Sequence, residues 1–248
     1  MYYLRFFNII ILNVWFYTLS PIVLILFLIF SLPILLIVSL TGKRRTMFLL
    51  RKIISFYGKA VYLTTWPWIK IKLQNVPKKQ GSPYIFVENH LSAFDPFIQA
   101  VLPFELVQCA RNYALDFPIL GRVAKLAGYI DVNRQTPEKI LEISSIYLKQ
   151  GTSLIFFPEG TRSTNGKTGP FHSTAFRVAI ENKTPIVPVV LFGLENKPPK
   201  GSFLFRPGTI TVKCLNVVNP ETFNELTPFI LKKQIRKLIK DKYENKNK

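Results

Sequence analysis

The stretch YIFVENHLSAFDP, residues 84–96, decides the fold of this 248-residue chain. It opens with a short apolar run that predicts a buried β-strand. Asp95 followed by Pro96 is typical of a helix N-cap and first helical position, so a helix is expected to begin there. A buried strand that leads through a polar loop into a helix is typical of an α/β domain, in which ligands bind at the strand ends.

That polar loop contains His90 and Asp95, five residues apart. On a helix, residues at this spacing point about 140° away from each other, so the two side chains can meet only in a loop. An Asp that accepts a hydrogen bond from an imidazole ring fixes its tautomer and leaves the second nitrogen free to take a proton. The pair is therefore a candidate general base with its orienting acid. On these residues alone, an ordinary loop histidine beside a helix cap remains the alternative.

Short apolar runs elsewhere predict further strands, and longer periodic stretches predict helices. The strand candidates are SLIFF from Ser153, IVPVVLF from Ile186 and TITVKCLNVV from Thr209. The helix candidates begin at Pro96 and span residues 117–127 and 137–150, the last bracketed by Thr136 and Gly151. We expect one α/β catalytic domain, residues 69–227, with a central mixed, largely parallel sheet flanked by helices.

A second motif, FPEGTRS at residues 157–163, follows the second predicted strand. Gly160 permits a tight turn, and Arg162 offers a planar fork that suits a phosphate group. The alternative is a polar turn in which Glu159 pairs incidentally with Arg162. The motif predicts a phosphate site at a strand end, where His90 is also expected.

The N-terminal segment is too apolar to remain in water. Residues 6–42 contain no charged side chain, and the basic cluster of residues 43–45 follows them. A secretory signal peptide has a shorter apolar region and a small-residue cleavage site, so residues 1–42 are expected to be a retained membrane anchor. The basic cluster predicts that the anchor ends on the cytoplasmic face, with the catalytic domain there, at a membrane of the bacterial inner-membrane type.

Two arrangements of this anchor are open, since about 20 apolar residues cross a bilayer. Pro21 and Pro33 are expected to break or kink it, which favours a two-helix hairpin that dips into one leaflet. A single transmembrane span over residues 21–40, after an interfacial helix, is the alternative. Residues 43–68 mix basic and apolar side chains at helical spacing and are predicted to be an amphipathic interfacial linker.

The 33 Lys and Arg residues against 14 Asp and Glu give a net charge of +19, which favours an anionic partner. With an anchor present, that partner is expected to be an anionic phospholipid membrane. The tail, residues 228–248, predicts a basic amphipathic helix without a nucleic-acid-binding signature, so no nucleic acid is expected. Cys109 and Cys214 are too few to indicate a disulfide framework or a metal cluster.

Taken in order, these motifs resemble those of the 1-acylglycerol-3-phosphate acyltransferases, within the glycerolipid acyltransferase superfamily. The resemblance spans residues 83–192, and its first and third blocks are the specific ones. The four blocks are Asn89, His90 and Asp95; GYIDVNR, with Gly128 and Arg134; FPEGTRS, with Pro158 and Ser163; and TPIVPVV, with Pro185 and Pro188.

The resemblance implies an activity. His90 would act as general base on the sn-2 hydroxyl of lysophosphatidic acid, and Asp95 would orient it. Acyl transfer from acyl-CoA or acyl carrier protein would make phosphatidic acid without a covalent acyl-enzyme, a metal or a cofactor. The acceptor's phosphate would be held by Glu159, Gly160, Thr161 and Arg162, with Arg134 as a second contact. Glu159 is expected to orient an arginine rather than touch the anion.

The sequence departs from the family pattern after the third block, where His172 stands in a place that relatives commonly fill with Lys. This departure leaves the acceptor headgroup open. Another lysophospholipid or glycerol 3-phosphate is the alternative acceptor. A basic, membrane-tethered binding protein that keeps the fold without the chemistry is the alternative class.

Overall fold

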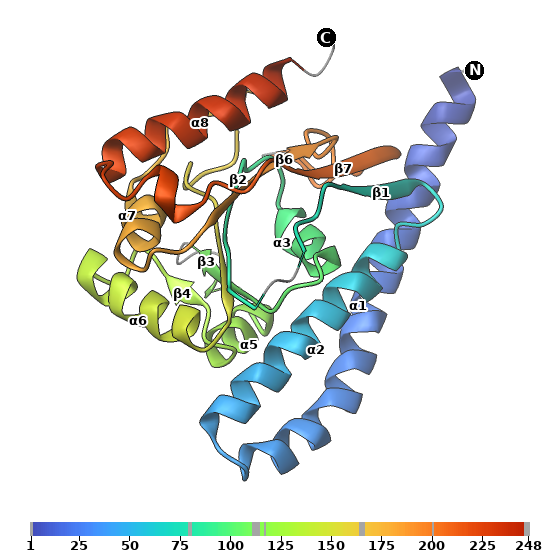
Figure 1. The fold of residues 1–248 in the computed structure, drawn as a ribbon. Helices are drawn as coiled ribbons and strands as arrows, with labels where there is room; N and C mark the ends of the chain where they lie inside the picture. Colours follow the sequence, from blue (N-terminus) through green and yellow to red (C-terminus); the bar gives the residue numbers. More distant parts are fainter. Residues whose placement is uncertain are drawn as a thin grey trace. The chain divides into compact units, whose positions relative to one another are not determined.

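The computed structural model describes residues 2–245 apart from 79–80, 111–114, 117, 164–166 and 200, with side chains from residue 6 onward. Its elements are drawn in Figure 1. The strands are β1 (Ile69–Gln74), β2 (Ile85–Glu88), β3 (Leu106–Ala110), β4 (Ile130–Asp131), β5 (Ser153–Phe156), β6 (Ile186–Phe192) and β7 (Gly208–Cys214). The helices are α1 (Tyr2–Ser39), α2 (Lys43–Leu63), α3 (Asp95–Ile98), α5 (Leu120–Leu126), α6 (Pro137–Lys149), α7 (Thr174–Glu181) and α8 (Pro228–Glu244), with short 3₁₀ turns η1 (Gln99–Val101) and η2 (Pro220–Thr222).

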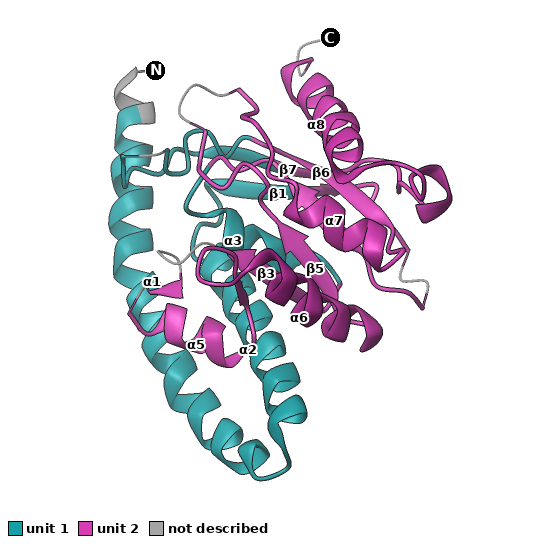
Figure 2. Ribbon diagram, turned by 90° about the vertical axis from the view of Figure 1, so that its left-hand side faces the viewer, with its two compact units in different colours: residues 1–72, 92–103, 193–210 teal, residues 73–91, 104–192, 211–248 magenta. Residues whose placement is uncertain are grey.

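The chain divides into two compact units, coloured separately in Figure 2. Unit 1 comprises residues 1–72, 92–103 and 193–210. Unit 2 comprises residues 73–91, 104–192 and 211–248. Each unit is therefore assembled from three stretches that lie far apart in the sequence.

The described strands are hydrogen-bonded in the order β1-β7-β6-β2-β5-β3-β4. β2 runs parallel to both β5 and β6, and β3 runs parallel to β5 and β4, whereas β7 is antiparallel to β6. Every residue of β2 and β5 is buried, which is why these strands read as continuous apolar runs. The expected mixed, largely parallel sheet is confirmed.

Helices of unit 2 pack on this sheet, as expected. α6 contacts β5, α7 contacts β2 and α8 contacts β6. α6 begins as its sequence predicts, because the Thr136 hydroxyl oxygen accepts the Lys139 N–H at 3.2 Å and Pro137 occupies the first turn. Gly151 follows the helix with a φ of 79°, a left-handed conformation that favours glycine.

Three strands, β1, β3 and β4, do not correspond to a predicted one. β4 is only two residues long, too short for a periodic signal, and β3 carries a polar residue, Gln108, within a short apolar run. The helix expected over residues 117–127 is present from Leu120, and Phe117 lies outside the described residues. The expected tail helix ends at Glu244, and residues 246–248 lie outside the described chain.

The two-helix anchor expected within residues 1–42 is wrong. α1 continues past Pro21 and Pro33 to Ser39. Each proline removes one backbone hydrogen bond, but the many remaining bonds of a 38-residue helix keep it continuous. A hairpin forms instead between α1 and α2, which lie side by side in Figure 1 and are in ring contact, with Phe27 and Tyr57 5.2 Å apart.

α1 packs on the rest of unit 1 through a few side chains and is otherwise exposed, since even Val14 in its first half is 63% exposed. Leu12 is fully buried in unit 1, and the Asn13 amide bonds both backbone groups of Phe205, at 2.8 and 2.9 Å. Near the other end of the helix, Ile37 is 68% exposed and Leu40, just beyond it, is 88% exposed. Within the described chain, α1 is the one helix long and apolar enough to cross a membrane.

Candidate active site

The polar motifs of unit 2 follow parallel strands that are neighbours in the sheet. His90 follows β2, the FPEGTRS turn follows β5, and Arg134 follows β4. Between β5 and β4 lies β3, and Asp116 is in the connection that leaves it. Because parallel strands present their carboxyl ends at one edge, these side chains belong to the edge at which α/β sheets bind ligands.

His90 is joined to the third motif by its backbone. Its N–H donates to Glu159 Oε1 at 3.1 Å across a separation of 69 residues, and its carbonyl accepts the Ser163 N–H at 2.8 Å. The imidazole lies 4.5 Å from the Phe157 ring, centroid to centroid, and the residue is only 7% exposed. The structure therefore brings the NHLSAFD and FPEGTRS motifs together around His90.

Glu159 links two loops through backbone N–H groups. Its carboxylate is buried, and besides the His90 N–H it accepts the Gly169 N–H on Oε2 at 2.8 Å. Such bonds to an ionised acceptor are among the stronger ones in proteins. Glu159 thus braces the loop that carries His90, a role that its motif did not reveal. Its expected part in orienting an arginine stays a prediction.

Two further polar residues of the first motif form hydrogen bonds, Asn89 within unit 2 and Asp95 within unit 1. Asn89 bridges β2 to β6, because its amide donates to the Leu191 carbonyl at 3.1 Å and accepts the Leu191 N–H at 2.8 Å. Asp95 is fully buried in unit 1, where it is the first residue of α3 rather than the expected N-cap, and it accepts the Ser92 N–H at 3.0 Å. The pairing of Asp95 with the His90 imidazole stays a prediction.

The FPEGTRS turn leaves two of its polar side chains, Thr161 and Arg162, at least partly exposed. Gly160 has a φ of 65° and its N–H donates to the Phe157 carbonyl at 3.0 Å, which confirms the tight turn. Thr161 is exposed and Arg162 half-buried, and neither side chain forms a hydrogen bond or ion pair within the described residues. Both are therefore accessible to a ligand, and their contact with a phosphate stays a prediction.

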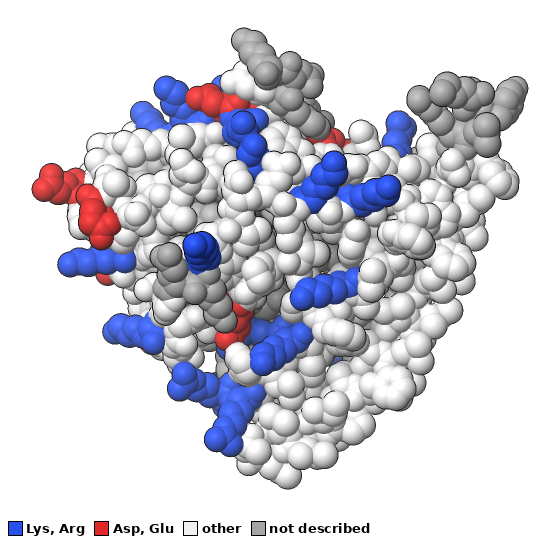
Figure 3. Space-filling model, turned by 45° about the vertical axis from the view of Figure 1, so that its right-hand side comes forward, with Lys and Arg blue, Asp and Glu red and all other residues white. Residues whose placement is uncertain are grey.

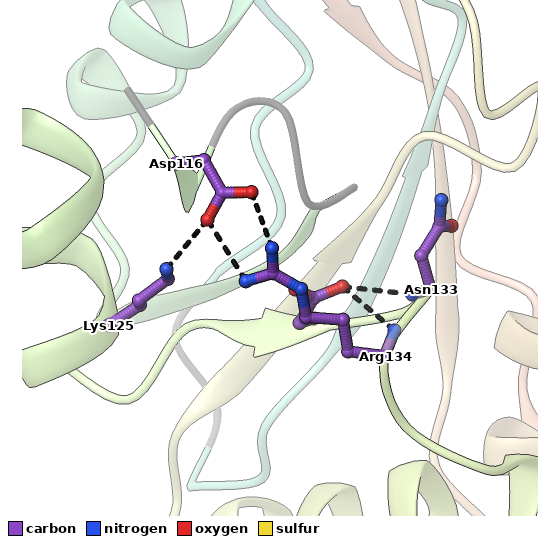
Figure 4. A network of polar contacts seen from close by, with 5 residues as sticks. Asp116, Lys125, Asn133 and Arg134 are labelled. Carbon is purple, nitrogen blue, oxygen red and sulfur yellow. Dashed lines mark hydrogen bonds and ion pairs between the residues drawn. The ribbon is translucent and has the colours of Figure 1, made fainter. Parts of the chain in front are cut away.

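Arg134 belongs to a network of polar contacts (Figure 4) that sequence reasoning missed. Its guanidinium forms two bonds to the Asp116 carboxylate, at 2.9 and 2.6 Å, and Lys125 adds a third at 2.8 Å. Lys125, and then Arg134, hold the pKa of Asp116 below its ordinary value. Asp131 accepts the backbone N–H groups of Asn133 and Arg134 at 3.0 and 3.1 Å. No sequence signal pointed to this network, because β3, the strand that precedes Asp116, was not predicted.

Three residues of the matching blocks support the backbone. Gly128 takes a φ of 84° just after α5. The buried Pro188 pairs with Val87 in the ladder between β6 and β2, and Pro158 accepts the His172 N–H at 2.7 Å. The His172 side chain itself is exposed. These positions shape the sheet edge, and their side chains add no charge to it.

The charge of this edge suits an anion. Arg134 and Lys125 both pair with Asp116, Arg134 also lies 3.8 Å from the Asp131 carboxylate, and Arg162 stands on the neighbouring turn. Among the residues that the structure describes, no three His, Cys, Asp or Glu side chains are placed to hold a metal ion. The side chains of this edge offer an imidazole, a buried carboxylate at Glu159 and cationic groups that attract a phosphate.

Comparisons with known proteins identify the family of this chain. A family described as acyltransferase matches residues 69–192. The 1-acyl-sn-glycerol-3-phosphate acyltransferase of Limnanthes douglasii is 31% identical over 211 residues, which make up 74% of this chain and 73% of the relative. The human 1-acyl-sn-glycerol-3-phosphate acyltransferase alpha is 32% identical over 57% of this chain and 52% of its own length.

A solved structure shares the fold. The crystal structure of the 1-acyl-sn-glycerophosphate (LPA) acyltransferase PlsC from Thermotoga maritima matches with a TM-score of 0.76 and 23% identity, over 98% of each chain. The fold, the ordered motifs and the sequence matches lead to one conclusion: this chain is a member of the 1-acyl-sn-glycerol-3-phosphate acyltransferase family.

Proposed function

We propose that this chain is a 1-acylglycerol-3-phosphate O-acyltransferase. It transfers an acyl group from acyl-CoA or acyl carrier protein to the sn-2 hydroxyl of lysophosphatidic acid, and the product is phosphatidic acid. The observation that carries this proposal is the bond from the His90 N–H to Glu159, because it links the candidate base to the turn that holds the candidate phosphate ligands. The names of the relatives supply the reaction.

In this reaction His90 takes the proton from the acceptor hydroxyl as the oxygen attacks the thioester carbonyl. The new C–O bond forms, the C–S bond breaks, and the proton passes from His90 to the leaving thiolate. Asp95 is proposed to fix the imidazole tautomer. General-base help contributes about 10² to 10⁴ in rate, so the positioning of both substrates supplies much of the remainder.

The phosphate of the acceptor is proposed to bind at the FPEGTRS turn. Arg162 supplies a forked cation, and Thr161 supplies a hydroxyl donor. Arg134 is proposed as a second contact, for which a phosphate would compete with the Asp116 carboxylate. The phosphate would then hold the glycerol backbone with its free hydroxyl near His90.

The hairpin of α1 and α2 is proposed to hold the enzyme on an anionic membrane, with the catalytic side facing the cytoplasm. Figure 3 shows the surface of α1 as uncharged, and its last turns expose large apolar side chains such as Ile37 and Leu40. Exposed basic residues, Lys43, Arg44 and Arg45, follow at the turn of the hairpin. Apolar side chains would enter the lipid, and the basic residues would contact anionic headgroups.

The proposal is tested with the purified full-length chain in liposomes. Lysophosphatidic acid, glycerol 3-phosphate and neutral-headgroup lysophospholipids are offered separately, each with acyl-CoA or acyl carrier protein, and products are identified by mass spectrometry. Phosphatidic acid formed from lysophosphatidic acid is the expected product. Product from another acceptor alone would reassign the substrate, and no product from any pair would leave a non-catalytic binding protein.

A further inference from the structure

We infer that Arg236, on α8, is a positioning residue for His90. It acts through the peptide group between Thr168 and Gly169 and through Glu159. This inference rests on the proposed function in that it assigns Arg236 to the same catalytic site. All five residues lie in unit 2.

Arg236 differs from the other basic residues of α8. The helix buries Leu231, Ile235, Ile239 and Tyr243 along one face. Arg236 is half-buried beside that face, and its guanidinium donates to two successive carbonyl groups, from Nη2 to Thr168 at 2.9 Å and from Nε to Gly169 at 2.6 Å. A rigid fork can make this pair of bonds, whereas the single ammonium of a lysine cannot reproduce the same geometry.

The bond from Arg236 to the Thr168 carbonyl belongs to a chain of hydrogen bonds that leads to Glu159 in the FPEGTRS motif. The Thr168 carbonyl and the Gly169 N–H belong to one peptide group, and that N–H donates to Glu159 Oε2 at 2.8 Å. The guanidinium therefore holds one end of the peptide and the carboxylate holds the other. Chains of hydrogen bonds polarise one another, so the two charges strengthen the bonds between them.

Glu159 completes the connection to His90. Its second oxygen, Oε1, accepts the His90 N–H at 3.1 Å. Gly169 leaves little space beside this carboxylate, because a Cβ added there would lie 3.0 Å from Glu159 Oε2. A shift of the peptide group at Gly169 would thus move the carboxylate, and with it the loop that carries His90. Displacements of about 1 Å at a reacting group can cost about 10²-fold in rate.

The test compares Arg236→Met with Lys237→Met in the full-length chain. Both variants remove one positive charge from α8, but Lys237 is exposed. We expect kcat to fall about tenfold or more in Arg236→Met, with the apparent KM for lysophosphatidic acid changed less than about twofold. Arg236→Lys should recover only part of kcat, and Lys237→Met should match the wild type.

A second variant disturbs the same chain of hydrogen bonds at Gly169 instead of at Arg236. Gly169→Ala keeps Arg236 and adds a methyl group against Glu159. It should lower kcat on its own, and the double variant should be less impaired than the product of the single effects, because both act through one peptide group. Independent, multiplicative effects would contradict the inference, as would a folded Arg236→Met with the kcat of the wild type.

A readout without substrate separates this inference from the proposed function. The chain has two histidines, so selective ¹⁵N-histidine labelling gives two backbone amide signals, assigned with His172→Gln. The His90 amide should shift in Arg236→Met and Gly169→Ala and stay fixed in Lys237→Met. If the His90 amide signal shifts in Arg236→Met but the wild type transfers no acyl group, the proposed function is rejected and the inference stands. If the wild type transfers the acyl group but the His90 amide signal does not shift in Arg236→Met, the inference is rejected and the proposed function stands.

Discussion

Arg162 is the residue on which the proposed phosphate recognition depends. A guanidinium that binds a phosphate oxygen pair contributes charge-assisted hydrogen bonds, each worth about 1.5–3 kcal/mol. Arg162→Ala should therefore raise the apparent KM for lysophosphatidic acid about tenfold or more and leave the KM of the acyl donor unchanged. Arg122→Ala, which removes an exposed arginine from α5, is the matched control. Steady-state kinetics in liposomes measure both constants, and an unaltered acceptor KM would remove the phosphate role.

Asp116 gives a pH-dependent prediction at the same scale. Its pKa is held below the ordinary value of 3.8, first by Lys125 and then by Arg134. Because the pKa of Asp116 is lower in the folded state, the stabilisation by its ion pairs is fully present above the ordinary pKa. It is lost as the pH falls through the lowered pKa. The stability involved is small because the carboxylate is exposed.

The measurement is a ¹³C NMR titration of the Asp116 carboxylate. The midpoint should lie below 3.8 in the wild type and rise towards that value in Arg134→Gln, which removes one of the two cationic partners. Arg177→Gln, in which the lost arginine pairs with Glu138 instead, is the control. An Asp116 midpoint that does not respond to the loss of Arg134 would show that the network of Figure 4 does not form in solution.

Single residues differ in how far their roles can be read from the sequence. The turn at Gly160 follows from local chemistry and is confirmed, and a helix starts where Asp95 and Pro96 predict it, although Asp95 is its first residue and not its cap. The hydrogen bonds that Asn89 and Glu159 form could not be read from the sequence, because their partners, Leu191 and Gly169, belong to other segments of the chain. Local patterns carry no information on such long-range partners.

At the scale of elements, some strands could be predicted from the sequence and others could not. β2, β5 and β6 are buried runs of apolar residues and were predicted. β3 and β4 owe their existence to pairing with neighbours, since β3 lies between β5 and β4 in parallel register. Their short and partly polar sequences give no independent signal.

α1 shows the opposite case, in which the packing and hydrogen bonds of a long helix override a local signal. Pro21 and Pro33 indicated a break, yet the helix continues through both. The turn of the hairpin lies instead at residues 40–42, where Gly42 has a φ of 115°. The hairpin was thus predicted in kind, but it was placed inside α1 rather than between α1 and α2.

The first half of α1 supports unit 1, and this leads to a prediction about stability. Asn13 satisfies both the N–H and the carbonyl of Phe205. Asn13→Ala would leave these backbone groups unpaired, so the free energy of unfolding should fall by about 1–3 kcal/mol. Asn8→Ala, at an exposed position of the same helix, should leave it unchanged. Thermal unfolding in detergent measures the difference, and equal midpoints for the two variants would contradict the contact.

At the scale of the whole molecule, the hairpin predicts the topology in the membrane. In unit 1 the N-terminal half of α1 bonds to Phe205 through Asn13, whereas other side chains of this half, such as Val14 at 63%, are exposed. A hairpin returns to the face from which it enters, whereas a single span would put the N-terminus on the opposite face. Both ends of the hairpin should therefore lie on one face of the membrane.

Cysteine labelling tests this topology. A membrane-impermeant maleimide should label Asn8→Cys and Asn196→Cys from the same side of sealed vesicles. The native thiols add little background, since Cys109 and Cys214 are buried and burial raises their pKa. Labelling of the two positions from opposite sides would establish a single transmembrane span instead.

The most direct test of the central claim uses the two histidines of the chain. Phosphatidic acid formed from lysophosphatidic acid and ¹³C-labelled acyl donor is quantified by mass spectrometry for the wild type, His90→Ala and His172→Ala. Loss of the general base should lower kcat by about 10²-fold or more in His90→Ala, while the exposed His172 can be removed without effect. Acyl transfer by His90→Ala at the wild-type rate would contradict the assignment of His90 as the base.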